Sequence, residues 1–164
     1  MLKGKPKPLN QGEYTALAEF RYQLRRYLRF MEEKAREAGQ NPQQYQLILA
    51  LKGLPPGTGP SIGALAERLQ LNHNSMVELV DRCEQRGLVR RTRSGSDRRQ
   101  VELAITAEGD AFLRKLASAG REELRIVGPI LAENIQRLTA QEPQGMKHGP
   151  GTARKTGGSK KTGP

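Results

Sequence analysis

Apolar residues recur at intervals of three and four positions in the first quarter of the chain, within a segment otherwise rich in arginine and glutamate. This spacing gathers side chains on one face of a helix, and Gly39 is suited to end that helix. The pattern therefore predicts one long amphipathic helix over residues 12–38. Its apolar face comprises Leu17, Phe20, Leu24, Leu28 and Met31.

A second helix is predicted over residues 42–52. Asn41 supplies a capping residue, Pro42 stands at the first helical position, and Gln44 is placed to complete a capping box. The prolines and glycines of residues 54–60 stop both helix and strand, so we expect a surface loop there.

Two short helical patterns follow this loop. The first, over residues 61–69, has apolar residues at helical spacing. After a tight turn at residues 70–72, Asn72 is suited to cap a second helix that runs to about Arg86. The apolar stripe of that second helix comprises Met76, Leu79, Val80 and Cys83. Two short helices joined by about three residues are typical of a helix-turn-helix.

A β-hairpin is predicted directly after the helix-turn-helix. Gly87 is suited to end the preceding helix, residues 88–93 form a candidate strand, and residues 94–97 have strong turn chemistry. In the return strand, Val101, Leu103 and Ile105 alternate with more polar positions. Because alternate strand residues share a face, we expect one face of the hairpin to pack on the core.

The predicted hairpin carries an arginine cluster. Only one acidic residue, Asp97, opposes it within the same ten positions. A solvated charged loop is the ordinary alternative, but a basic hairpin that follows a helix-turn-helix has the order of parts of a DNA-binding wing. The cluster comprises Arg90, Arg91, Arg93, Arg98 and Arg99.

The end of the regular pattern is helical again. Thr106 is suited to cap a helix, and we expect a break near Gly120 followed by another helix up to about residue 140. The two segments carry more apolar surface than a small lobe can bury, so we expect a partner chain to cover it. Packing against the first helix of the same chain is the alternative. The apolar positions are Phe112, Leu113, Leu116, Leu124, Val127, Leu131, Ile135 and Leu138.

The formal net charge of the chain is +11, and most of it lies in the flanks. Residues 1–10 hold three lysines, and residues 141–164 hold five basic side chains and one acidic side chain. Neither flank has hydrophobic periodicity. We therefore expect a flexible basic N-terminus over residues 1–11 and a disordered basic tail over residues 141–164.

Five short segments occur in a distinctive order and spacing. They are Leu-Ala-Glu-Arg-Leu at residues 65–69, Leu-Val-Asp-Arg at 79–82, Arg-Gly-Leu-Val-Arg-Arg at 86–91, Asp-Arg-Arg at 97–99 and Ile-Thr-Ala-Glu-Gly at 105–109. Together they resemble the multiple antibiotic resistance regulator (MarR) family of winged helix-turn-helix transcription factors. The resemblance spans about residues 12–140, and Asp97 with Arg99 is its most diagnostic part.

The resemblance implies a mainly α fold with a small β-hairpin wing, in which a DNA-binding lobe (about 42–106) joins a helical dimerisation region (about 12–38 and 107–140). It also implies a homodimer that binds double-stranded DNA at an imperfect palindrome, as a repressor that a small aromatic or phenolic effector releases. The effector would bind between the dimerisation helices and the lobe. Tyrosines are candidates to line that site, namely Tyr14, Tyr22, Tyr27 and Tyr45.

The residues that read the bases are then expected on the exposed N-terminal face of the second helix of the motif. Asn74 is suited to bind adenine, Glu78 to accept from the cytosine amino group, and Val77 to contact a thymine methyl group. The family often has a basic residue where this chain has Glu78, which leaves the base preference open. The full recognition set is His73, Asn74, Ser75, Val77 and Glu78.

The wing is expected to enter the minor groove, where narrow A·T-rich segments concentrate negative potential. Arg99 is the strongest candidate contact. Asp97 is expected to orient the wing arginine, with a simple turn-forming role as the alternative. The wing set is Arg91, Arg93, Asp97, Arg98 and Arg99.

The sequence lacks the residues that redox sensing, metal binding or catalysis would require. The single cysteine, Cys83, lies on an apolar stripe, so we expect core packing rather than redox sensing. Two histidines far apart suggest no metal site, and no nucleophile–base pair or phosphate loop indicates an enzyme or a cofactor. No apolar run is long enough to cross a membrane and no signal peptide is visible, so we expect a cytoplasmic protein.

A second function class remains open. The basic flanks would also suit an architectural protein that coats DNA without sequence choice. Such a protein would bind any duplex with comparable affinity and would lose that affinity when residues 141–164 are removed.

Overall fold

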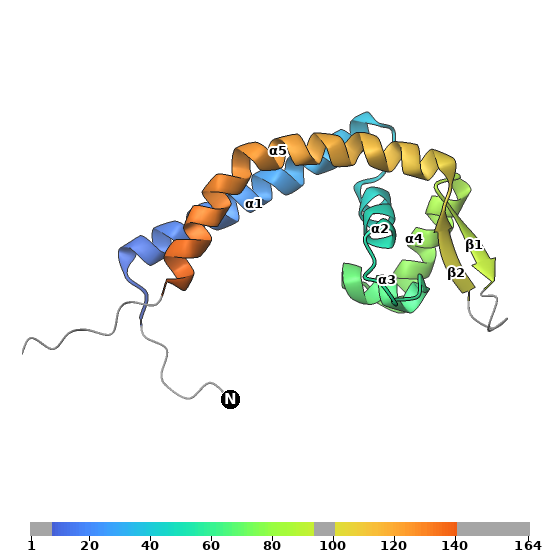
Figure 1. Cartoon of the computed structure of the whole chain (residues 1–164), viewed down its shortest axis with the longest axis horizontal. Coiled ribbons are helices and arrows are strands. Elements are labelled where there is room, and N and C mark those ends of the chain that lie inside the picture. Colours follow the sequence, from blue (N-terminus) through green and yellow to red (C-terminus); the bar gives the residue numbers. More distant parts are fainter. Residues whose placement is uncertain (1–7, 94–100, 141–164) are drawn as a thin grey trace, which may run out of the picture.

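The computed structural model describes residues 8–93 and 101–140. They form five helices and a two-stranded antiparallel sheet. Helices α1 (Gln11–Glu37) and α5 (Ala107–Thr139) run side by side along much of their length. The remaining elements gather in a lobe at one end of this helical arm (Figure 1). The predicted fold class, a winged helix-turn-helix lobe joined to a helical region, is confirmed.

The lobe contains α2 (Pro42–Lys52), α3 (Ile62–Leu69) and α4 (His73–Gln85). The predicted caps form: Asn41 and Gln44 make a capping box, and the Asn72 side chain accepts from the backbone N–H of Ser75 at 2.8 Å. The loop between α3 and α4 turns at Gln70, which has a left-handed backbone with φ of 52°. The predicted helix-turn-helix is therefore confirmed.

The lobe is held together by a buried core. Its members come from every helix of the motif, from both strands and from the inner ends of α1 and α5. Burial of such side chains contributes about 1.5–3 kcal/mol each to folding. The largest fully buried side chains of this core are Leu47, Ile48, Leu65, Met76, Leu79, Val80, Cys83, Leu88 and Val89.

The hairpin consists of β1 (Val89–Arg93) and β2 (Val101–Ile105), with Arg91 opposite Leu103. The predicted alternation holds for Leu103, which is buried, and for Ile105, which packs on the core, whereas Val101 is exposed. Residues 60–61, predicted as the end of a surface loop and the start of a helix, also join the sheet. The backbone N–H of Leu103 donates to the carbonyl of Pro60 at 2.9 Å.

One long helix replaces the two that the sequence predicts after residue 106. Helix α5 continues without interruption through Gly120 and Pro129, so the predicted break is wrong. A glycine inside a helix costs only about 1 kcal/mol relative to alanine, and here it permits close packing. A Cβ on Gly120 would lie 2.9 Å from the Met31 Sδ and 3.1 Å from the Tyr27 Oη of α1.

Helix α1 begins at a capping box formed by Asn10 and Glu13. It packs antiparallel to α5, because Arg26 contacts Glu123 while Met31, further along α1, lies against Gly120, earlier in α5. The expected alternative of packing within the chain is therefore correct in part. However, the face that α1 buries is mainly Ala16, Gln23, Met31 and Ala35. Most of the predicted apolar stripe of α1 stays exposed, including Leu17, Leu24 and Leu28.

Candidate nucleic-acid interface

Helix α4 presents a polar face to solvent. Its buried stripe is the predicted one, and it packs against α2, α3 and the hairpin. On the outer side, His73, Asn74 and Glu78 are exposed, while Ser75 and Val77 are half-buried. All five predicted recognition residues therefore lie on α4 with some surface accessible, and none is buried in the core.

In the sequence, residues 94–100 stand between β1 and β2, the two strands of the hairpin next to α4. The predicted wing residues Asp97, Arg98 and Arg99 lie in this segment, outside the described residues, and so does the side chain of Arg93. The two described strands that flank this segment pair with each other and pack on the core.

Arg91 lies on β1 and has close acidic partners. Its Nη2 lies 2.5 Å from the Oδ1 of Asp81, and its Nη1 donates to the Oε2 of Glu84. The hydrogen bond to Asp81 is the main cause that raises the pKa of Arg91 above its usual range. The expectation that only Asp97 opposes the arginine cluster is thus wrong for Arg91. The carboxylates that oppose Arg91 come from α4, which lies outside the ten sequence positions of the cluster.

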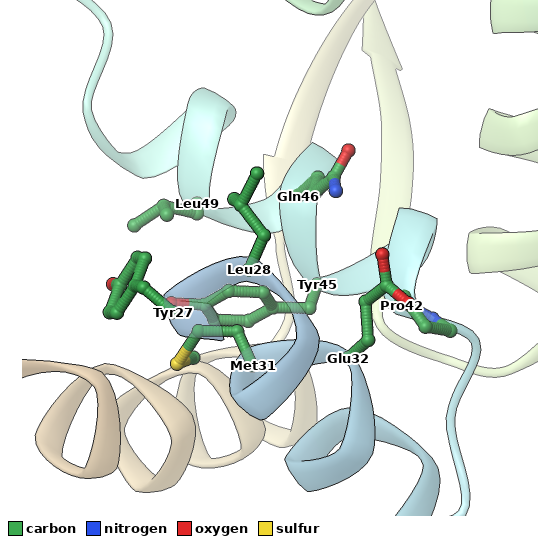
Figure 2. Close-up of a pocket in the computed structure, with 8 residues that line it drawn as sticks. All are labelled: Tyr27, Leu28, Met31, Glu32, Pro42, Tyr45, Gln46 and Leu49. Atoms are coloured by element: carbon green, nitrogen blue, oxygen red, sulfur yellow. The ribbon is translucent and has the colours of Figure 1, made fainter. Parts of the chain in front are cut away.

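A cavity of about 230 Å³ lies between α1 and α2. Figure 2 shows its lining side chains converging from these two helices. Tyr27 and Tyr45, two of the four tyrosines named as candidates for an effector site, line it. Tyr14 and Tyr22 lie on the exposed outer part of α1 and do not line it. The other lining residues, which the sequence did not single out for this role, are Leu28, Met31, Glu32, Pro42, Gln46 and Leu49.

Tyr45 is the more deeply held of the two tyrosines in this cavity. It is 7% exposed, and its ring meets the edge of Phe112 from α5 at a centroid distance of 6.4 Å. Desolvation raises the pKa of both Tyr45 and Tyr27, so both phenols are neutral at physiological pH. Neutral phenols can donate and accept hydrogen bonds inside a mostly apolar site.

Cys83 is fully buried within the lobe. Desolvation raises the pKa of its thiol to about 12. Because the thiolate is the reactive form, we expect this cysteine to react with a thiol reagent at least about a hundredfold more slowly in the native protein than in the unfolded chain. A colorimetric thiol assay at pH 8, with and without denaturant, checks this. Equal rates in the two states would contradict core burial.

The described residues contain no group of three or more histidine, cysteine, aspartate or glutamate side chains placed to hold a metal ion. Within the same ranges, no helix has the length and apolarity needed to cross a membrane.

Comparison with known proteins connects this geometry to a family. A family model described as MarR family matches residues 38–100. The HTH-type transcriptional repressor MdtR of Bacillus subtilis (strain 168) is 29% identical over 133 residues, which cover 74% of this chain and 84% of that protein. The matched region of the family model contains α2, α3, α4 and β1.

Solved structures agree on the fold. The crystal structure of AbsC, a MarR family transcriptional regulator from Streptomyces coelicolor, has a TM-score of 0.63 and 22% identity, with 81% of this chain and 90% of that one covered. The crystal structure of an S. aureus MepR–DNA complex has a TM-score of 0.56 and 20% identity, with 71% and 88% covered. In its motifs and in its fold, the chain is similar to the MarR family of winged helix-turn-helix transcription factors.

Proposed function

We propose that this protein represses transcription as a homodimer that binds an imperfect DNA palindrome and leaves it when a small aromatic or phenolic molecule binds. Its similarity to MarR-family regulators supports a DNA-binding transcriptional regulator rather than an enzyme. The observation that carries the proposal is the exposed polar face of α4 beside the β1–β2 hairpin. A cytoplasmic location is part of the proposal, because a regulator acts where the DNA lies.

The proposed contacts divide between two grooves. Asn74 and Glu78, both exposed on the first turns of α4, would read base edges in the major groove, with His73, Ser75 and Val77 beside them. The wing residues Arg93, Asp97, Arg98 and Arg99 would meet the neighbouring minor groove, where Arg98 and Arg99 insert and Asp97 orients them. Basic groups that contact DNA release counterions, so binding should fall steeply with salt.

The proposed dimer rests on apolar surface that the chain does not bury by itself. Leu24 and Leu28 of α1 remain 38% and 46% exposed, and Leu124 and Ile135 of α5 remain 42% and 45% exposed. Removing such surface from water is the main driving force of association. A second copy of the same helical arm offers the matching surface, as a two-fold symmetric interface requires.

Dimer symmetry determines the expected DNA site. Two copies of α4 related by a two-fold axis would enter successive major grooves on one side of the duplex. The site should therefore be an imperfect palindrome whose half-sites lie about one helical turn apart.

The cavity between α1 and α2 supports the proposed effector. It lies where the helical arm meets the lobe, and its walls combine apolar side chains with the neutral phenols of Tyr27 and Tyr45 and the amide of Gln46. A few polar groups in an apolar cavity are typical of small-molecule sites. A molecule bound there would contact both α1 and α2, so it could bias how the lobe sits on the arm.

The wing assignment is tested by Arg99→Ala. We expect this variant to bind the palindromic site about tenfold to a hundredfold more weakly, because a groove arginine contributes about 1–3 kcal/mol. The dimer should stay intact, because Arg99 belongs to neither α1 nor α5, whose exposed apolar residues form the proposed interface. Fluorescence anisotropy with a labelled duplex measures the affinity, and sedimentation measures the oligomeric state. Unchanged affinity would refute the wing assignment.

A competition experiment distinguishes the regulator from the architectural alternative. A regulator that reads bases stays bound to a labelled palindrome when excess unlabelled random duplex is added. A protein that binds through its basic flanks is displaced from the palindrome by the same competitor. Removal of residues 141–164 should lower the affinity for both duplexes by a similar factor if the tail adds only charge. We expect the preference for the palindrome to survive that truncation.

A further inference from the structure

Arg91 joins the hairpin to α4 through both its side chain and its backbone. The guanidinium contacts Asp81 and Glu84, and the backbone N–H of Arg91 donates to the Oε1 of Glu84 at 3.0 Å. Asp81 and Glu84 stand three positions apart on α4, so they lie on the same side of that helix. One arginine is thus held by two carboxylates and offers them three donors.

The backbone contact is unusual for a surface ion pair. In the two-stranded sheet, β1 carries an unpaired edge, and the amide of Arg91 donates to a side chain of α4. A carboxylate that accepts both from a strand amide and from the guanidinium of the same residue fixes the position of the strand as well as the side chain. The side chain of Arg91 is only 29% exposed, so water competes less for it than for a fully solvated arginine.

Most other ion pairs among the described residues join neighbours on one helix. Examples are Arg29 with Glu33 and Arg137 with Glu133, both four residues apart and well exposed. Such pairs contribute little and fix no tertiary geometry. The contact of Arg91 instead spans two elements that both belong to the proposed DNA interface.

We propose that Arg91, Asp81 and Glu84 form a clamp that sets the position of the wing relative to α4, so that both elements reach their grooves together. The proposal rests on the proposed DNA-binding function and deepens it. Arg91 is then a positioning residue that acts through its two carboxylate partners, and it is not a phosphate contact as its place in the arginine cluster suggested. A duplex contacts the wing and α4 at a fixed spacing, so loss of the clamp weakens specific binding more than non-specific binding.

Arg91 could instead act only through its charge, as a phosphate contact. Neutralising its two carboxylate partners distinguishes this role from the clamp. The double variant Asp81→Asn with Glu84→Gln removes two negative charges close to the DNA and leaves Arg91 in place. If Arg91 simply contacts phosphate, this variant binds every duplex more tightly. If the clamp operates, it binds the palindrome more weakly despite its more positive charge.

The experiment measures affinities of the full chain for the selected palindrome and for a scrambled duplex of equal length, over a range of salt concentrations. We expect Arg91→Gln and the double carboxylate variant each to lower the preference for the palindrome roughly tenfold. Arg91→Lys should behave like Arg91→Gln, because an ammonium keeps the charge but not the paired donors. It also provides a second variant if the glutamine protein fails to fold. Arg90→Gln, an exposed neighbour on β1, is the matched control and should leave the preference unchanged.

Two results would overturn the clamp. One is tighter binding of the palindrome by the double carboxylate variant. The other is an Arg91→Gln variant whose affinity falls equally for both duplexes while its salt dependence drops by about one contact per protomer, as a phosphate contact requires. In either case the unaltered protein would still prefer the palindrome. Absence of any such preference in the unaltered protein would instead refute the proposed function, and the clamp with it.

Discussion

Gly109→Ala is expected to lower the free energy of unfolding by about 3 kcal/mol and the melting temperature by roughly 10 °C. A Cβ on Gly109 would lie 2.0 Å from the carbonyl oxygen of Leu88 and 3.1 Å from the Cγ2 of Ile105. Leu88 directly precedes β1, and its carbonyl is backbone, so it has no flexible end that can turn aside. The first turn of α5 must therefore move away from the base of the hairpin.

The same place holds the hairpin to α5 by hydrogen bonds. The backbone N–H of Thr106 donates to the Leu88 carbonyl at 3.2 Å, and the Thr106 hydroxyl donates to the Gly87 carbonyl at 2.5 Å and accepts from the N–H of Gly109 at 3.0 Å. Displacing α5 strains these bonds, and the wing moves with them. We therefore expect palindrome affinity to fall as well.

Gly128→Ala provides the matched control, because it changes the same residue type in the same helix. A Cβ on Gly128 meets no atom within 4 Å in this chain. Alanine favours the helix by up to about 1 kcal/mol, so this variant should be as stable as the original protein or slightly more so. Urea unfolding followed by circular dichroism measures both variants. Equal stability of the two would contradict the packing of α5 on the hairpin.

Leu24→Glu is expected to weaken the proposed dimer by more than about a hundredfold. Leu24 lies in the middle of the exposed apolar stripe of α1, and a two-fold interface would bury the new carboxylate twice without a partner. A monomer presents only one lobe to a two-part site. We therefore expect palindrome binding to fall by a similar factor, while the lobe stays folded because Leu24 is outside its core.

Gln136→Glu adds the same negative charge at an exposed position of α5. Placed away from the apolar stripe, this charge should leave the dimer intact. Sedimentation equilibrium of both variants over a range of protein concentrations gives the dissociation constants, and circular dichroism confirms folding. A Leu24→Glu protein that dimerises like the original would show that the stripe of α1 lies outside the interface.

Local patterns predicted the lobe well, because its elements are set by short-range chemistry. Asn41, Asn72 and Thr106 each cap the helix that follows them, as expected from residue type and position. Gly87 has a positive φ of 69° directly after α4, which is the conformation that glycine favours at a helix end. The exposed side of α4 followed from the same helical spacing that identified its buried side.

Features that depend on tertiary contacts were not predictable in this way. The continuity of α5 through Gly120 depends on how closely α1 approaches it, which no local pattern encodes. The partners of Arg91 stand seven and ten positions earlier in the sequence and on a different element. Of four candidate tyrosines, only Tyr27 and Tyr45 line the cavity, because its position depends on how α1 packs on α2.

Sequence-specific DNA binding is tested most directly by selecting bound sequences from a pool of random duplexes with the 164-residue chain, at low and at physiological salt. We expect enrichment of an imperfect palindrome with half-sites about one helical turn apart. We also expect an Asn74→Ala protein to lose selectivity at one position in each half-site. A bound pool without any enriched sequence at either salt concentration would contradict sequence-specific binding.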